Sequence, residues 1–371
     1  MTRPFVLAAG GTGGHLFPAE ALAAELLSTG SAVHLVSDAR VDNFAGRVAG
    51  IETHHVRAAQ LGGGAAHAAH ALGELALGTL QARRLLRRLA PVCVIGFGGY
   101  ASVPTMLAAV SLGLPTVIHE QNAVLGRTNR LLAPRVRRIA TGFPATIGLR
   151  PAERARTVHT GNPVRPELLV LARTRYKPPL RGGTIELLIL GGSQGARIMT
   201  EIVPPALASL PTRLREMLRV SHQARSEDLP AAEALYRKNR IQAEVRSFFT
   251  DIPERLVRAH LAICRAGAST VAELAAIGRP ALLIPYPHAT DDHQAANARA
   301  FAETGAGWVI PQSELRADTL ALHLEDLLGN LTALSDAAQR AGDFGRPDAA
   351  ARLAQLAVEL GFGSRPQGRA A

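Results

Sequence analysis

The chain has 371 residues, enough for two domains, and its 47% hydrophobic content supplies two aliphatic cores. Lysine and arginine outnumber aspartate and glutamate by 41 to 30, so the formal net charge of +11 indicates an anionic partner: nucleic acid, an anionic membrane or a phosphorylated substrate. The sequence shows no transmembrane run, no disulfide framework around Cys93 and Cys264 and no signal peptide, so we expect a cytoplasmic protein.

Apolar runs of strand length alternate with helix-like stretches in the first half of the chain. Strands are predicted at residues 5–9, 32–37, 53–56, 92–97, 116–119 and 137–141. Helices are predicted at residues 18–28, within 70–89, and at 102–112. This alternation is typical of a doubly wound parallel sheet.

The pattern breaks at residues 160–179, where turn residues and a Pro/Arg-rich stretch predict a linker. The rhythm then restarts, with strands predicted at residues 185–190, 217–221, 243–247, 261–264, 281–285 and 308–310, and a helix at 348–360. We therefore expect two α/β domains, 1–163 and 164–343. A last helix at about 344–362 should pack back onto the first domain, before a frayed tail at 363–371.

Two glycine-rich turns, residues 10–15 and 191–196, each follow a predicted strand and precede a helix. This is the opening of a nucleotide-binding βαβ unit, in which phosphate binds at the helix N-terminus. Leu16 replaces the third glycine of the dinucleotide fingerprint, but Asp38 stands where a ribose-binding acid would be. An NAD-linked oxidoreductase therefore stays open as an alternative.

His15 follows the first glycine turn directly, so it either points into a phosphate site as a general base or serves a structural role. The cluster at 96–100 and the polar run at 119–122 also follow predicted strands. Both should lie at the carboxyl edge of the first sheet, where open α/β folds bind ligands, although a solvated loop is the alternative for the second.

The second half carries two further candidate sites. Glu273, early in a predicted helix, can accept hydrogen bonds from a ribose diol or simply complement the helix dipole. The run Asp291-Asp292-His293-Gln294 lacks an intact metal spacing, so a sugar-hydroxyl clamp or a helix cap is the better interpretation. A nucleic-acid binder would use the positive charge, but the chain has few aromatic residues for stacking and the glycine turns stay unexplained.

Seven segments occur in one order and carry a family resemblance: 10–15, 96–100, 119–122, 161–165, 191–196, 265–268 with Thr270 and Glu273, and 292–294. Together they resemble the MurG family of glycosyltransferases of bacterial cell-wall synthesis, over residues 4 to 360. The resemblance implies a GT-B fold, with two Rossmann-like domains facing each other across a cleft. It also implies inverting transfer of N-acetylglucosamine from UDP-GlcNAc to the C4 hydroxyl of lipid I, giving lipid II. A diacylglycerol glycosyltransferase would share the donor motifs and is the alternative within enzymes.

The resemblance also implies roles for individual residues. His15 or Glu120 is the catalytic base, and Tyr100 and His119 bind the acceptor. The implied UDP-GlcNAc-binding residues are Thr12, Gly13, Gly14, Asn122, Arg165, Ser193, Gln194, Phe249, Ala268, Ser269, Thr270, Glu273 and Gln294. No metal or cofactor is required, although a stimulatory divalent ion stays open. Pro287 stands where the family often has glutamine, so the sugar clamp around Gln294 departs from the family pattern.

Because lipid I is membrane-bound, the resemblance places the protein peripherally on the cytoplasmic face of the inner membrane, with other cell-wall synthesis proteins as open partners. Leucines at 72, 75, 80, 85, 86 and 89 lie among Arg83, Arg84, Arg87 and Arg88, and a second basic group, including Arg135, Arg137 and Arg138, lies near Leu131 and Leu132. Such clusters bind anionic interfaces. The alternative is an amphipathic core helix with solvated arginines.

Overall fold

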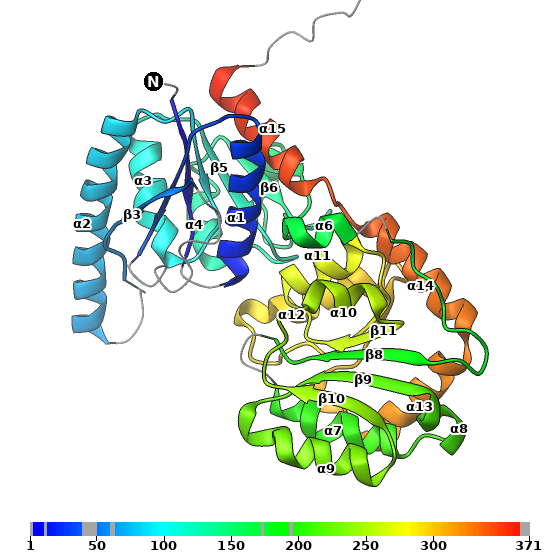
Figure 1. The fold of residues 1–371 in the computed structure, drawn as a ribbon. Coiled ribbons are helices and arrows are strands. Elements are labelled where there is room, and N and C mark those ends of the chain that lie inside the picture. The colour runs from blue at the N-terminus through cyan, green and yellow to red at the C-terminus, as the bar shows by residue number, and fades with distance from the viewer. Residues whose placement is uncertain are drawn as a thin grey trace, which may run out of the picture. The chain divides into compact units, whose positions relative to one another are not determined.

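The computed structural model describes residues 3–10, 13–38, 50–59, 64–171, 174–192 and 196–363. Within these residues the chain forms two compact units, each with its own sheet (Figure 1). The first unit runs up to Pro166 and takes in the chain again from Asp348, and the second unit is Glu167–Pro347. The unit boundaries thus fall at 166/167 and 347/348, compared with the expected 163/164 and 343/344.

The first unit contains a seven-stranded parallel sheet in the order β3-β2-β1-β4-β5-β6-β7. The strands are β1 Phe5–Ala8, β2 Val33–Ser37, β3 Glu52–His55, β4 Cys93–Gly96, β5 Thr116–Glu120, β6 Arg138–Thr141 and β7 Thr157–His159. The chain order reverses beside β1, with β2 on one side and β4 on the other, so the ligand-binding crevice of this topology lies beyond their carboxyl ends.

Helices cover both faces of this sheet. They are α1 Gly13–Ser28, α2 Ala65–Leu89, α3 Val103–Ser111, α4 Arg127–Leu132, α5 Pro151–Arg154 and α15 Ala349–Phe362. Side chains of α1 and α15 share one core with the sheet, and those of α2 and α3 share the other. The last helix therefore belongs to the core of the first unit (Figure 1).

Two predictions for the first unit were wrong in detail. Helix α1 begins at Gly13, not at residue 18, because Leu16 and Pro18 are buried in its first turns. Pro18 has no backbone N–H, so it removes only one helical hydrogen bond. Strand β7 was missed because it has three residues and its single aliphatic side chain, Val158, is 39% exposed, so the sequence carries no strand pattern there.

The second unit contains a six-stranded parallel sheet in the order β10-β9-β8-β11-β12-β13. The strands are β8 Ile185–Leu190, β9 Leu218–Gln223, β10 Gln242–Arg246, β11 Leu261–Cys264, β12 Ala281–Leu283 and β13 Gly307–Val309. All six coincide with predicted runs. The order reverses between β8 and β11, which places a second crevice beyond the ends of these strands.

The helices of the second unit also lie on both faces of its sheet. They are α6 Pro166–Leu171, α7 Arg197–Ala208, α8 Thr212–Met217, α9 Leu229–Lys238, α10 Ile252–Arg258, α11 Ala268–Ala276, α12 His293–Ala302, α13 Ala317–Gly329 and α14 Leu331–Phe344. Helix α6 begins at the last residue of the first unit, inside the stretch predicted as an irregular linker. Side chains of α7, α9 and α13 pack into one core, and α10 to α12 lie on the opposite face (Figure 1).

The parallel order of both sheets confirms the predicted α/β class. Cys93 and Cys264 are buried, unbonded residues of β4 and β11, and burial raises the pKa of each thiol to about 12. Among the residues that the structure describes, no helix is both long and apolar enough to cross a membrane.

Candidate active site

In the first unit, the ring of His15 lies against the glycine turn that follows β4. His15 is the third residue of α1 and is half-buried. A Cβ atom on Gly98 would lie 3.3 Å from Cε1 of this ring, and one on Gly99 would lie 3.0 Å from Cδ2. Both glycines have positive φ, +84° and +70°, which side chains rarely adopt. The bare backbone of this turn therefore orients the imidazole.

Glu120, the last residue of β5, organises the loop that follows it. Its side chain is 2% exposed. One carboxylate oxygen accepts hydrogen bonds from the backbone N–H and the side-chain amide of Asn122, at 3.0 and 3.3 Å. The other accepts from the Gly126 N–H at 2.9 Å and from the Asn129 amide at 2.8 Å. The carboxylate thus closes the loop and fixes the start of α4.

Asn129 extends this network toward His15. Its amide nitrogen also donates to the carbonyl of His119 at 3.1 Å and lies 3.5 Å from the position of a Cβ on Gly98. Glu120 therefore reaches the turn that orients His15 through one intervening side chain. No local pattern predicted a role for Asn129, because it lies 9 residues beyond Glu120.

His119 is completely buried and uses both ring nitrogens inside the first unit. Nε2 donates to the Gly161 carbonyl at 3.0 Å, and Nδ1 accepts from the Gln121 amide at 3.2 Å. Burial lowers the pKa of His119 to about 4, so the ring is neutral. It joins the end of β5 to the segment after β7. Asn162, in that segment, is 4% exposed, and its side-chain amide has no hydrogen-bond partner among the described residues.

Other predicted residues of the first unit surround the same strand ends. Gly13 and Gly14 form the first turn of α1, and Tyr100 begins a short 3-10 turn after Gly99. The guanidinium of Arg165 lies 5.9 Å from the ring centre of Phe17. The structure thus brings together the turns after β1 and β4 and the end of β5. Thr12 lies outside the described residues, so its role stays a prediction.

In the second unit, predicted donor residues occupy the start of α11. Gly267 precedes the helix, and Ala268, Ser269 and Thr270 form its first turn. The Ser269 hydroxyl is buried and has no partner among the described residues. The backbone N–H groups of such a turn, together with the helix dipole, favour an anion. Glu273, 8% exposed, lies in the next turn of α11.

The loops beside α11 hold the remaining donor candidates. Phe249 is 3% exposed, and the Arg255 guanidinium lies 4.0 Å from its ring centre, so its ring is packed inside the second unit. Gln294, the second residue of α12, accepts a hydrogen bond from the Tyr286 N–H at 3.0 Å. Arg265 donates to the carbonyls of Ile284 and Pro285 and so fixes this loop. Ser193 and Gln194 lie outside the described residues.

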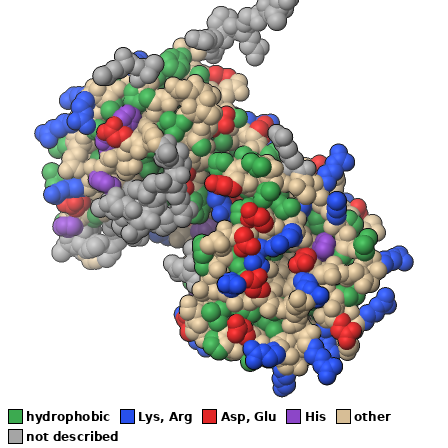
Figure 2. All heavy atoms as spheres, in the orientation of Figure 1, with side chains coloured by type: hydrophobic (Ala, Val, Ile, Leu, Met, Phe, Trp, Pro, Cys, Tyr) green, Lys and Arg blue, Asp and Glu red, His purple; other side chains and the backbone are tan. Residues whose placement is uncertain are grey.

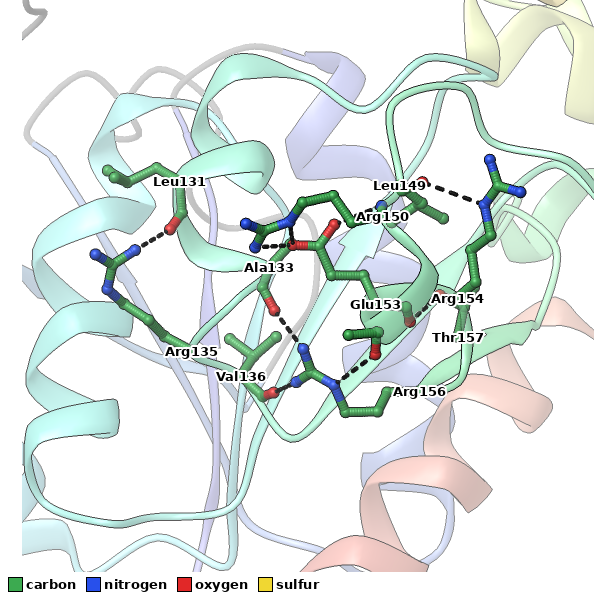
Figure 3. Close-up of polar contacts among 11 residues, drawn as sticks. Leu131, Ala133, Arg135, Val136, Leu149, Arg150, Glu153, Arg154, Arg156 and Thr157 are labelled. Carbon is green, nitrogen blue, oxygen red and sulfur yellow. Dashed lines mark hydrogen bonds and ion pairs between the residues drawn. The ribbon is translucent and has the colours of Figure 1, made fainter.

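Basic residues of the first unit divide into exposed and anchored groups. Arg84, Arg87 and Arg88 are exposed on α2, and Figure 2 shows basic side chains gathered along this helix. Arg83 instead donates to the Ser111 carbonyl at 3.3 Å and to the Ser111 hydroxyl. Arg156 donates to the carbonyls of Ala133 and Val136, and so closes the end of α4 (Figure 3).

The second basic group keeps its positive charges at the surface. Arg135 donates to the Leu131 carbonyl at 2.6 Å, and Arg137 donates to the Gly113 carbonyl at 3.2 Å (Figure 3 shows Arg135). Arg135, Arg137 and Arg138 are all exposed. Leu131 is 41% exposed, whereas Leu132 is fully buried. The three arginines are therefore available to an anionic partner. Of the two leucines beside them, only Leu131 is exposed as well.

Comparison with known proteins agrees with this arrangement. Residues 5–141 match the glycosyltransferase family 28 N-terminal domain, and residues 186–353 match the C-terminal domain. A UDP-N-acetylglucosamine–N-acetylmuramyl-(pentapeptide) pyrophosphoryl-undecaprenol N-acetylglucosamine transferase of Rhodospirillum centenum is 54% identical over 355 residues, which cover 96% of this chain and 94% of that protein. The similarly named protein of Paramagnetospirillum magneticum is 52% identical over 360 residues, 96% of this chain and 97% of its own.

The solved structures lead to the same family. The crystal structure of Acinetobacter baumannii MurG matches with a TM-score of 0.78 and 31% identity, covering 95% of this chain and 98% of that one. The calicheamicin glycosyltransferase CalG4, at 16% identity and a TM-score of 0.67, covers 98% of this chain and 100% of its own and shares the fold. The fold is thus the predicted GT-B class of two Rossmann-like domains, and the chain belongs to glycosyltransferase family 28, among the N-acetylglucosaminyltransferases that include MurG.

Proposed function

We propose that this protein transfers N-acetylglucosamine from UDP-GlcNAc to the C4 hydroxyl of the N-acetylmuramyl group of lipid I, giving lipid II and UDP. The observation that carries the proposal is the 54% identity, over 96% of the chain, with a relative named for this donor and this acceptor. Both family 28 domains match, which favours a glycosyltransferase over an NAD-linked oxidoreductase. The acceptor in the name of that relative also disfavours a diacylglycerol-type transferase.

His15 is the catalytic base of this proposal. The acceptor hydroxyl attacks the anomeric carbon from the face opposite UDP, and the base takes the hydroxyl proton as the bond to UDP breaks. The glycine turn at Gly98 and Gly99 holds the half-buried His15 ring in one orientation. Glu120, by contrast, is 2% exposed, and both of its oxygens already accept hydrogen bonds. We therefore assign Glu120 a positioning role.

The same argument changes the role proposed for His119. Because its ring is buried and bonded at both nitrogens, it supports the acceptor site through Gly161 and Gln121 instead of touching the acceptor. Tyr100, which is partly exposed, is then the better candidate for acceptor contact. Asn122 and Arg165 keep their proposed roles toward the donor, together with Thr12, Gly13 and Gly14.

The second unit supplies the donor site. The start of α11, with Ala268, Ser269 and Thr270, would hold the diphosphate together with Ser193 and Gln194. The developing charge on UDP is stabilised by such preorganised N–H groups, so no metal or cofactor is required. Glu273 would bind the ribose diol, and the Phe249 backbone the uracil. Gln294, although it is already bonded to the Tyr286 N–H, would contact the sugar hydroxyls through its amide NH₂.

Membrane attachment is part of the proposal, because lipid I lies in the bilayer. On the solvent-facing side of α2, Leu72, Leu77 and Leu80 are 56%, 46% and 53% exposed, and Arg84, Arg87 and Arg88 follow on the same side. Exposed leucines beside arginines are typical of interfacial helices. The protein would thus act peripherally, at the cytoplasmic face of the inner membrane, with Arg135, Arg137 and Arg138 contributing positive charge.

The proposal is tested by incubating the purified full chain with UDP-GlcNAc and a short-chain lipid I analogue. We expect acceptor-dependent release of UDP and formation of the disaccharide product, identified by mass spectrometry. Diacylglycerol and NAD serve as controls for the two alternatives. Release of UDP with diacylglycerol but not with the lipid I analogue would overturn the assignment of the acceptor.

A further inference from the structure

A cluster of three metal-ligating side chains lies outside the proposed active site, at the β3 edge of the first sheet. His34 is on β2, and Glu52 and His54 are on β3, the edge strand. His34 pairs with Glu52 in the parallel register, and Val36 pairs with His54. Since side chains two residues apart share a sheet face, all three point to the face that α2 covers.

The ligand atoms of these side chains converge on one point. Nδ1 of His34 lies 2.9 Å from Nε2 of His54. One carboxylate oxygen of Glu52 lies 3.5 Å from His34 Nδ1, and the other lies 3.5 Å from His54 Nε2. At Zn–N and Zn–O bond lengths of about 2.0–2.2 Å, neighbouring ligands of a tetrahedral zinc ion lie roughly 3.3 Å apart. Each histidine nitrogen lies near that spacing from one of the two Glu52 oxygens, whereas the two hydrogen-bonded nitrogens, 2.9 Å apart, would separate slightly on coordination.

The surroundings also suit a metal ligand set. The two histidines are mostly buried, at 16% and 13% exposure, whereas Glu52 is 67% exposed. The rings stack with their centres 5.1 Å apart, so both ligand nitrogens are held together without the metal. The exposed side leaves a coordination position for water.

We propose that His34, Glu52 and His54 form a binding site for Zn²⁺ or a similar divalent transition-metal ion. Two imidazoles and a carboxylate are a common zinc ligand set, with the fourth position open to solvent. Coordination requires each histidine to carry its proton on the other ring nitrogen, so the hydrogen bond between the rings is replaced by two metal bonds. The ion would fasten the edge strand β3 to β2 and stabilise the folded state through linkage.

The experiment measures Zn²⁺ binding to the untagged, full-length protein by competition with a chromophoric chelator, together with thermal unfolding with and without Zn²⁺. We expect one tightly bound ion and a higher melting temperature. Glu52→Gln and His54→Ala should weaken binding at least tenfold and lose the thermal shift. His70→Ala, an exposed histidine on α2, is the matched control and should leave both unchanged.

Co²⁺ provides a second readout, because a four-coordinate Co²⁺ ion with nitrogen ligands gives strong visible absorption bands. These bands should appear in the parent protein and vanish in both site variants. If His54→Ala does not fold, the Zn²⁺ affinity of Glu52→Gln tests the proposal by itself, since the exposed Glu52 side chain contributes little to the core. Equal Zn²⁺ affinity in the parent protein and Glu52→Gln, or an equal loss in His70→Ala, would overturn the proposal.

Discussion

At the scale of single residues, the structure distinguishes His15 from Glu120, the two candidates for the catalytic base that the sequence left open. His15 presents a half-buried ring held by glycine backbone, whereas the buried Glu120 carboxylate is committed to Asn122, Gly126 and Asn129. A base needs an available lone pair within reach of the substrate hydroxyl. This requirement favours His15 and makes Glu120 a residue that acts through its neighbours.

Replacing His15 with alanine should lower kcat by about 100-fold or more while UDP affinity changes little, because general-base catalysis contributes about 10²–10⁴-fold. Steady-state kinetics gives kcat, and isothermal titration gives the affinity for UDP. If both quantities fell by the same factor, His15 would be a donor-positioning residue instead.

Glu120→Gln tests the positioning role. The new amide NH₂ cannot accept from the N–H and amide donors that face the carboxylate, so we expect a loss of stability of about 1–3 kcal/mol. Turnover should fall together with stability, because the loop that supports His15 loosens. Denaturant unfolding and steady-state kinetics are the measurements. A variant of unchanged stability that lost as much turnover as His15→Ala would identify Glu120 as the base.

At the scale of elements, the glycine turn after β4 works because it carries no side chains. Gly99 approaches both Gly10 and His15, since a Cβ at this position would lie 3.0 Å from the Gly10 Cα and from the ring. Neither backbone can move without shifting β1 or β4, which pair along their whole length. The position of His15 therefore depends on two elements that are distant in sequence.

Gly99→Ala should accordingly reduce turnover more than tenfold by displacing His15, since small misplacements of a catalytic group are costly. UDP binding should be retained. Gly113→Ala is a matched control, because Gly113 has the same kind of backbone, with φ +69°, but its added Cβ meets nothing within 4 Å. The variant and its control are compared by kcat and by melting temperature. An equal loss of activity in both would trace the effect to backbone strain.

Helix α2 is the element on which the sequence prediction of a membrane face was partly wrong. Leu86 is buried, and the partly buried Leu85 and Leu89 pack against the core, so these leucines face the first unit and not the solvent side of the helix. Leu77, which the sequence analysis did not single out, is 46% exposed, beside Leu72 and Leu80. The part of α2 that belongs to the proposed membrane face is therefore its solvent side.

Reversing the charge of Arg84, Arg87 and Arg88 to glutamate should weaken binding to anionic vesicles by about 100-fold at low salt, at roughly 1 kcal/mol for each residue. UDP affinity should not change. Vesicle co-sedimentation measures the effect. The same change at Arg213, Arg237 and Lys238, all exposed in the second unit, is the control for net charge. Unchanged vesicle binding of the α2 variant would remove this face from the proposal.

At the scale of the whole molecule, each unit contains a fully buried neutral histidine. His119 lies on β5 of the first unit, and His222 lies on β9 of the second, where its Nδ1 is 2.9 Å from the Tyr236 hydroxyl. Burial lowers the pKa of each to about 4. Unfolding exposes these rings to water, where the usual pKa is about 6.5. Both units should therefore lose stability on acidification.

The direction of this pH dependence follows from proton uptake. Between pH 6.5 and 4 the unfolded chain binds more protons, so the stabilisation present above pH 6.5 is lost as the pH falls through this window. Each histidine accounts for on the order of 3 kcal/mol. Thermal unfolding between pH 7.5 and 4.5 should show this decline in both units. His222→Gln should reduce this acid-induced loss of stability in the second unit only. An unaltered pH dependence of its melting temperature would contradict the assignment of the loss to His222.

Local signals in the sequence were sufficient to predict the fold class and most of the strands. Apolar runs, glycine turns and their spacing act between near neighbours. The two parallel sheets, the strand-end position of Glu120 and the positions of His15 and Glu273 early in helices could therefore be derived without coordinates. The short strand β7 and the start of α1 were missed because burial, not local pattern, decides them.

What only the tertiary structure decided depends on partners far apart in the chain. The turn at Gly98 and Gly99 meets His15 from more than 80 residues away, and His119 is bonded to Gly161, 42 residues on. The convergence of His34 and His54 on one point requires the register of β2 and β3. The sequence determined which chemical groups lie at the strand ends. Packing determined which of them are committed to structure and which stay accessible, because burial and hydrogen bonding belong to the folded chain.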